Sequence, residues 1–216
     1  MKSFKISINE KDINAVRDSF NVIKLILSVS SHIVNLPVSD LYYQDLEHPI
    51  PYVILCTSKN MNRLIWGDAS SQLHSVHFPF SITDNTTSLE LRYHSIKINS
   101  QIIQALKKLF ISENTCVSLE GLLDEFIEIF SDFDLSQLQQ QELWELYQHL
   151  YSFEICYLRY DYDPQHENGR LHPLHHLDIN FSNTGTYKLG LDSNMELSVF
   201  LDLLDTETNC QYISLC

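Results

Sequence analysis

The chain has 216 residues, with 28 acidic against 14 basic side chains and a formal net charge of −14. Hydrophobic residues make up 44% of it, a composition that excludes an intrinsically disordered chain. Because phosphate binding depends on lysine and arginine, the acidity argues against direct binding of duplex nucleic acid. It suits solubility or a basic protein partner. We expect one domain spanning residues 1–216, with a helical insertion at about 99–153.

A helix is predicted first, capped by Asn9 or Asp12 and ending before Pro37. Its apolar positions recur at three and four residues: Ile13, Val16, Phe20, Ile23 and Leu27. Strands are predicted next, with turns at Gly67-Asp68 and Asp84-Asn85. They span residues 52–57, 63–67, 73–82 and 89–98 and should form an antiparallel meander.

Three helices are predicted in the middle of the chain, at residues 100–111, 118–130 and 136–153. β pattern returns at residues 154–162, 176–181 and 186–191, and a short apolar helix follows at 195–204. This order predicts an α+β fold rather than alternating βαβ units. It has an N-terminal helix, an antiparallel sheet, a central helical segment and C-terminal strands that return to the sheet.

The cysteines and the hydropathy of the chain indicate its cellular compartment. The five cysteines are odd in number, scattered and without a CxxC pair: Cys56, Cys116, Cys156, Cys210 and Cys216. This pattern argues against a structural zinc site and a disulfide framework, and favours free thiols in a reducing cytoplasm. Early lysines interrupt any signal peptide, and the most apolar segment, near residues 22–34, is too short to span a bilayer. We expect a cytoplasmic protein without a membrane contact.

The stretch from Arg159 to Asp178 concentrates reactive side chains, including four of the ten histidines. Side chains alternate along a strand, so in an extended segment His175 shares a face with Leu177, while His176 and Asp178 share the other. The same alternation places Arg159 and Asp161 together on the preceding strand. A polar face of Arg159, Asp161, His176 and Asp178 is therefore geometrically possible.

Known metal and nuclease motifs fit this stretch poorly. His176-Leu177-Asp178 matches half of a two-histidine-one-carboxylate iron site, but no histidine follows it. HExxH and the paired cysteines of zinc deaminases are absent. Asn180 stands where a restriction-type nuclease needs lysine, Lys188 lies far along the chain, and Pro173 breaks the helix that a helical ribonuclease would need. We expect no metal and no cofactor.

Two interpretations of the stretch stay open. Histidines titrate near neutral pH, so a metal-independent ribonuclease could use them as acid and base, with arginine or lysine stabilising a phosphorane. The candidate catalytic residues are then Arg159, Asp161, His172, His175, His176 and Asp178. The alternative, which the sequence favours, is that these groups hydrogen-bond backbone and carboxylates to hold an irregular connection in place.

Residues 158–204 resemble an uncharacterised bacterial family, the domain of unknown function numbered 2290. The similarity lies in two motifs, Arg159-Tyr160-Asp161-Tyr162-Asp163-Pro164 and His172-Pro173-Leu174-His175-His176-Leu177. Where the family continues into a strand with cysteine and arginine, this chain has Thr186-Tyr187-Lys188. The resemblance implies a bacterial defence or toxin–antitoxin context and supplies no activity.

Three functions are compared on this basis. The leading prediction is an acidic accessory or interaction subunit of a bacterial defence-type assembly, bound to a protein partner. The alternative is a ribonuclease-like toxin or nuclease effector that uses residues 159–178. An inhibitor that imitates the charge of nucleic acid is a third, and it would require the acidic side chains to gather on one face.

Overall fold

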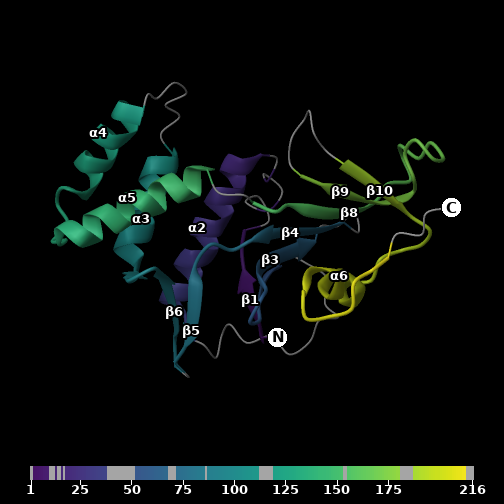
Figure 1. The fold of residues 1–216 in the computed structure, drawn as a ribbon, viewed down its shortest axis with the longest axis horizontal. Helices are drawn as coiled ribbons and strands as arrows, with labels where there is room; N and C mark the ends of the chain where they lie inside the picture. The colour runs from purple at the N-terminus through teal and green to yellow at the C-terminus, as the bar shows by residue number, and fades with distance from the viewer. Residues whose placement is uncertain are drawn as a thin grey trace. The chain divides into compact units, whose positions relative to one another are not determined.

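The computed structural model describes residues 2–9, 13, 16, 18–37, 52–67, 72–85, 87–111, 119–152, 155–180 and 187–212 (Figure 1). The chain divides into two compact units. Unit 1 comprises residues 1–18, 42–78 and 155–216, and unit 2 comprises residues 19–41 and 79–154. The prediction of one domain with an insertion at about 99–153 stays a prediction.

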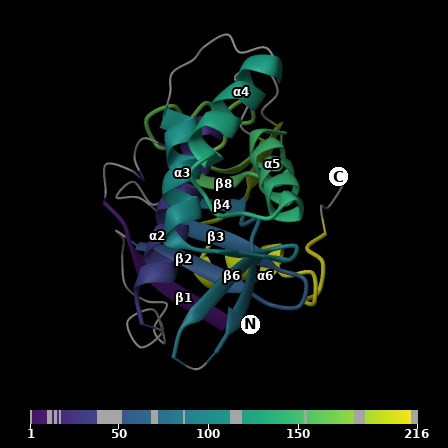
Figure 2. The same ribbon diagram turned by 90° about the vertical axis from the view of Figure 1, so that its left-hand side faces the viewer.

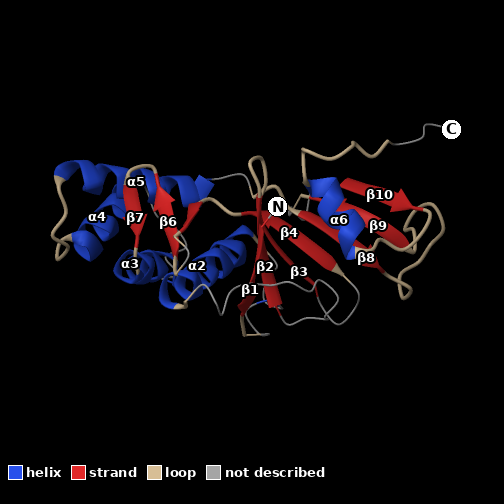
Figure 3. Ribbon diagram, turned by 90° about the horizontal axis from the view of Figure 1, so that it is seen from below, coloured by secondary structure: helices blue, strands red, loops and turns tan. Residues whose placement is uncertain are grey.

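Unit 1 is built on a seven-stranded antiparallel sheet in the order β1-β2-β3-β4-β8-β9-β10. Its strands are β1 (Lys2–Ser7), β2 (Tyr52–Thr57), β3 (Asn62–Gly67), β4 (Leu73–His77), β8 (Leu158–Tyr162), β9 (His175–Ile179) and β10 (Tyr187–Leu191). Segments far apart in sequence therefore meet in the middle, because β4 pairs with β8. Figure 3 shows the helix α6 (Leu197–Leu204) lying against the β8–β10 end of this sheet.

The two faces of the unit 1 sheet differ in chemistry. One face packs against α6 through an apolar cluster that includes Ile65, Tyr160, Leu177 and Phe200. The other face is apolar at the β1–β2 end of the sheet, where Ile6 and other side chains are fully buried. Across β8 and β9 that second face becomes charged, so the polar residues of the predicted stretch lie opposite α6.

Unit 2 combines helices with a three-stranded antiparallel sheet (Figure 2). Its elements are α2 (Ser19–Asn35), β5 (Ser81–Asp84), β6 (Leu89–Tyr93), β7 (Ile96–Ile98), α3 (Ser100–Ile111), α4 (Leu119–Phe130) and α5 (Gln137–Ser152). The helix α3 contacts α2 and α4. Aromatic rings fill the core, where Phe110 lies 5.6 Å from Phe20 and 5.3 Å from Tyr147 between ring centres.

The predicted α+β class is confirmed, and the central helices lie close to the expected positions. The first predicted helix is not continuous, because Ile13 is helical, Val16 is not, and α2 begins only at Ser19. Asp18 directly precedes the helix, where aspartate is favoured as a cap. The strand β1 was not predicted. Residues 10–12, Asp68 and Ser118 lie outside the described residues.

The strand predicted at residues 73–82 was also wrong in extent. It is two strands in different sheets, β4 in unit 1 and β5 in unit 2. Pro79 stands between them and has no amide hydrogen to donate to a ladder. The predicted turn at Asp84-Asn85 joins β5 to β6, where the Asn85 amide donates to the Ser88 carbonyl over 3.0 Å. Within the described ranges no helix has both the length and the apolar character needed to cross a membrane.

Candidate functional site

The register of β8 and β9 brings the predicted polar residues together. Arg159 pairs with Asp178, and Asp161 pairs with His176. Directly opposed residues of an antiparallel pair point to the same side of the sheet. The four side chains therefore form one cluster, here called the polar cluster, and the geometric part of the sequence prediction is confirmed. Its catalytic role stays a prediction.

Ion pairs connect the members of the polar cluster. Arg159 Nη2 lies 2.6 Å from Asp161 Oδ2 and 2.5 Å from Asp178 Oδ2. His176 Nε2 lies 3.4 Å from Asp161 Oδ2 and 3.9 Å from Asp178 Oδ1. The side chains of both aspartates are only 4% exposed and that of His176 1%, whereas Arg159 is 27% exposed. One arginine thus holds two buried carboxylates from opposite strands.

Burial and neighbouring charges act in opposite directions on the ionisation of this cluster. Desolvation raises the pKa of Asp161, and the Asp178 charge adds to this, while Arg159 and His176 oppose it. Desolvation alone would lower the pKa of Arg159, but Tyr157, Asp161 and Asp178 raise it overall. The guanidinium therefore stays charged, and Asp161 carries its negative charge at a cost.

The orientation of His176 is set by the backbone. Its Nδ1 atom lies 2.9 Å from the carbonyl oxygen of Pro173. Since a carbonyl oxygen only accepts hydrogen bonds, Nδ1 carries the proton and donates it. Nε2 is then the atom that faces Asp161 and Asp178, and in the neutral imidazole it presents a lone pair to them.

Several polar atoms around the cluster are buried without a hydrogen-bond partner. Among the described residues they include Arg159 Nε, Asp161 Oδ1, Asp178 Oδ1 and His172 Nδ1. Buried polar atoms are normally paired, so a group of them without protein partners at one place is a candidate binding site for an ion or a small polar ligand. Asp161, His176 and Asp178 each offer one ligand atom, and these atoms lie within 4.8 Å of one another.

The connection between β8 and β9 carries a second group of histidines nearer the surface. The Asp163 amide donates to the Leu174 carbonyl, and Asn168 bridges to His172 around Gly169, whose φ is +52°. His166 Nδ1 lies 3.0 Å from Asp163 Oδ2, and His172 Nε2 lies 3.9 Å from that same oxygen.

Asp163 is therefore flanked by two imidazoles. Desolvation raises the pKa of Asp163, but hydrogen bonds from His166 outweigh it and lower the pKa overall. The rings of His166 and His172 are 6.2 Å apart between centres, and those of His172 and His176 are 4.7 Å apart. A chain of imidazoles thus runs from solvent, where His166 is 73% exposed, to the buried polar cluster.

The polar row also extends along the sheet on both sides of Arg159. On one side Tyr157 hydrogen-bonds Arg159 and lies 3.1 Å from His74 Nδ1, and His74 stacks on Trp66 at 5.1 Å between ring centres. Burial raises the pKa of Tyr157 to about 12, so it remains a neutral phenol. On the other side Lys188 of β10 pairs with Asp178.

The structure places the six predicted residues in three positions. Four form the polar cluster, and His172 lies at its edge in van der Waals range of His176. His175 is on the opposite face, where its Nδ1 is 2.8 Å from the hydroxyl of Tyr160.

Two residues near the site, His166 and Lys188, were not among the site residues predicted from the sequence. His166 was missed, although its position three residues after Asp163 in a turn-rich segment is typical of a local carboxylate–histidine contact. Lys188 was set aside as too distant in sequence, yet it is the cross-strand neighbour of Asp178.

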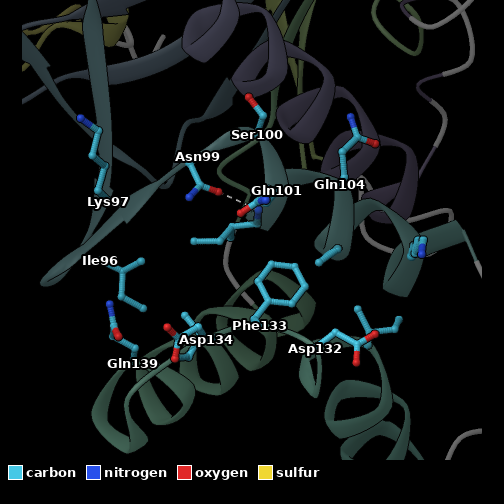
Figure 4. A pocket seen from close by; sticks show the side chains of 15 residues that line it. Ile96, Lys97, Asn99, Ser100, Gln101, Gln104, Asp132, Phe133, Asp134 and Gln139 are labelled. Atoms are coloured by element: carbon cyan, nitrogen blue, oxygen red, sulfur yellow. Dashed lines mark hydrogen bonds between the residues drawn. The ribbon is translucent and has the colours of Figure 1, made fainter.

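Unit 2 contains a hollow that could compete with the polar cluster as a binding site (Figure 4). It has a volume of about 860 Å³, and Phe133, between Asp132 and Asp134, projects into it beneath α3. Asn99 lines it, but the Asn99 side-chain oxygen accepts the Ile102 amide over 2.9 Å and so caps α3. The lining residue Asn99 thus has a structural role, whereas the polar cluster holds buried charges and polar atoms without a hydrogen-bond partner.

Comparison of the chain with family models, curated proteins and solved structures found no match. The resemblance of residues 158–204 to the family of domain 2290 therefore stays an expectation. The functional argument depends on the site itself.

Proposed function

We propose that the protein cleaves the phosphodiester bonds of single-stranded RNA by metal-independent acid–base catalysis at the β8–β9 connection. The observation that carries this proposal is the pair His166 and His172, whose ring centres are 6.2 Å apart on either side of Asp163. Two imidazoles at that separation can address the two ends of one phosphodiester. Their exposed fractions of 73% and 21% leave both in reach of a substrate, His172 through its Nε2 atom because its Nδ1 atom is buried.

The reaction needs one base and one acid, and each histidine can serve as either. One imidazole removes the proton of the ribose 2′-hydroxyl, whose oxygen attacks the phosphorus. The other donates a proton to the departing 5′-oxygen, which leaves a 2′,3′-cyclic phosphate. Asp163 orients the His166 ring through a hydrogen bond and lies 3.9 Å from His172 Nε2. Arg170, exposed in the turn between the two histidines, would stabilise the charge of the phosphorane.

The charge balance restricts the substrate class. With a formal charge of −14, the surface repels a long polyanion, so extended duplex contacts are disfavoured. A short unpaired strand needs only a few phosphate contacts and can place one ribose beside a protruding loop. The proposal is therefore restricted to single-stranded RNA.

A labelled RNA oligonucleotide tests this function. We expect fragments that end in a 2′,3′-cyclic phosphate, and we expect H166A or H172A to slow cleavage by about 10²–10⁴-fold. H149A, which removes another exposed histidine, is the matched control and should keep full activity. An oligonucleotide with 2′-deoxyribose at the cleaved position should resist. Cleavage of that substrate, or unchanged rates in both loop variants, would refute the mechanism.

We also infer a second candidate, the accessory subunit of a bacterial defence-type assembly, from exposed apolar side chains in unit 2. Leu123 and Ile127 lie one turn apart on α4 and are 39% and 56% exposed. Such side chains suit a protein partner when they are adjacent. Affinity capture from a bacterial host should recover a partner with the wild type and lose it with I127D. L171D, at an equally apolar exposed position in unit 1, should keep it.

A further inference from the structure

We propose that Asp161, His176 and Asp178 bind one divalent transition-metal cation of the zinc class inside unit 1. The site lies beneath the histidine pair proposed for RNA cleavage, and its role would be to hold His176 and the carboxylates in place. The buried cluster alone carries the metal site, which therefore does not depend on RNA cleavage by the histidine pair.

The donor atoms already have the spacing of a coordination sphere. Zn²⁺ binds nitrogen and oxygen at about 2.0–2.2 Å, so two donors at a tetrahedral angle are separated by about 3.4 Å. His176 Nε2 lies 3.4 Å from Asp161 Oδ2 and 3.9 Å from Asp178 Oδ1. One atom from each of the three residues falls within 4.8 Å of the others. Small side-chain rotations would complete the geometry.

The charges and distances of the cluster fit a bound cation better than a hydrogen bond from His176 Nε2. Two aspartates and one arginine carry a net charge of −1, which a cation would offset. A protonated Nε2 would donate to a carboxylate at about 2.7–3.2 Å. Both observed separations exceed that range, and Asp161 Oδ1 and Asp178 Oδ1 have no hydrogen-bond partner. A cation placed among these atoms would give His176 Nε2 and Asp178 Oδ1 a partner.

The outer contacts are those of a metal-binding histidine and its carboxylates. His176 Nδ1 donates to the Pro173 carbonyl, which fixes the tautomer that leaves Nε2 free to coordinate. Arg159 contacts the Oδ2 atom of each aspartate, so Asp178 would offer its Oδ1 atom to the cation, whereas Asp161 Oδ2 would be shared between Arg159 and the cation. Gly190 permits this arrangement, because a Cβ there would lie 2.9 Å from Cγ of Pro173.

The donor set selects the class of cation. Calcium and magnesium take oxygen ligands almost alone, whereas imidazole nitrogen suits zinc and its neighbours. Three protein donors leave a fourth position for water, as in open zinc sites. The buried Nδ1 of His172 has no hydrogen-bond partner, and its ring lies 4.7 Å from that of His176, so it is placed to bond such a water.

Zinc titration of the full chain is the direct test. Accessible thiols also bind zinc, so Cys116, Cys156, Cys210 and Cys216 are first replaced by serine, and the buried Cys56 is kept. After chelation and dialysis, calorimetric titration with ZnCl₂ should give one Zn²⁺ per chain. D178N and H176Q should each lower the affinity at least about 100-fold, while D163N, the matched control, should leave it unchanged. No binding, or equal binding by D178N, would overturn the proposal.

A second measurement needs no variant at the site, and so does not depend on how the variants fold. Co²⁺ added to the metal-free protein should produce the strong visible absorption of four-coordinate cobalt, and Zn²⁺ should displace it. Weak, octahedral-type absorption would exclude the site. Zinc binding without RNA cleavage would remove only the catalytic proposal, and RNA cleavage without zinc binding would remove only the metal site.

Discussion

The polar cluster of unit 1 and the aromatic core of unit 2 are both buried, yet they are built from opposite chemistry. Phe110 of unit 2 is fully buried and has ring neighbours on several elements. In unit 1 the equally buried positions hold Asp161, His176 and Asp178, with orphan oxygens beside them. Apolar side chains would fill the same sheet positions more cheaply. The buried charges are therefore the basis of the proposed metal site, whereas the rings of unit 2 form a hydrophobic core.

The largest effect should come from the aromatic core. F110A removes a fully buried ring and leaves a cavity, so we expect unfolding to cost about 3–5 kcal/mol less than in the wild type. Chemical denaturation followed by fluorescence measures this. L138A, at a side chain that is 61% exposed, is the control and should change stability by less than about 0.5 kcal/mol. A small effect of F110A would mean that unit 2 is not held by its rings.

Substitutions in the polar cluster should behave differently, because the loss of stability depends on which charged partner is removed. R159M leaves two buried carboxylates without their cation and should destabilise the protein by about 3 kcal/mol, the lower end for a partly exposed arginine. The triple variant R159M/D161L/D178L should recover most of this loss, because no unpaired charge remains. Both are measured by denaturation in the presence of a chelator. Equal destabilisation of the two variants would contradict this account.

Gly190 should give an intermediate effect. In G190A the new Cβ meets Pro173, and we expect a loss of about 1–2 kcal/mol from overpacking. Since the Pro173 carbonyl orients His176, zinc affinity should also fall by about 10–100-fold. Denaturation and zinc titration measure the two effects. L189A, at the neighbouring and partly exposed position, should leave zinc binding unchanged. Unaltered affinity in G190A would separate Pro173 from the site.

The smallest effect concerns pH and lies in unit 2. Burial lowers the pKa of His149 from its ordinary value of 6.5, and His94 adds to this. The unfolded chain then binds more protons, so stability is complete above pH 6.5 and falls as the pH drops below it. H149Q should flatten this dependence by less than about 0.5 kcal/mol, since the side chain is well solvated. Denaturation at several pH values, with Q148A as the control, measures this dependence. Stability that rises as the pH drops below 6.5 would contradict the prediction.

Alternation along two strands was enough to predict the polar cluster. His176 and Asp178 are two residues apart, as are Arg159 and Asp161, so each pair shares a face in any extended chain. The sequence could not supply the register, because pairing β8 with β9 one residue out of step would move one pair to the other side. His175 adjoins His176 in the sequence, so its position along the chain did not exclude it from the site. Only the period of two separates His175 from its neighbour His176.

Helix periodicity predicted the central helices nearly to the residue, because three amphipathic segments repeat the 3.6-residue pattern over long windows. Short strands were harder. The segment 73–82 has the composition of one strand, but its two halves pair with different sheets, and sequence composition carries no information about partners. For the same reason β1 was missed, since its pairing with β2 joins residues about fifty positions apart.

The sequence by itself determined the class of fold, the central helices and the two residue pairs that can share a face. These follow from local periods in side-chain chemistry, which any stretch of chain carries without reference to the rest. Tertiary structure decided which carboxylate oxygens are buried without a hydrogen-bond partner, which nitrogen of His176 carries the proton, and that Lys188 lies beside Asp178. Those properties arise between segments distant in sequence, because burial and hydrogen bonding depend on which atoms the pairing of strands brings within reach.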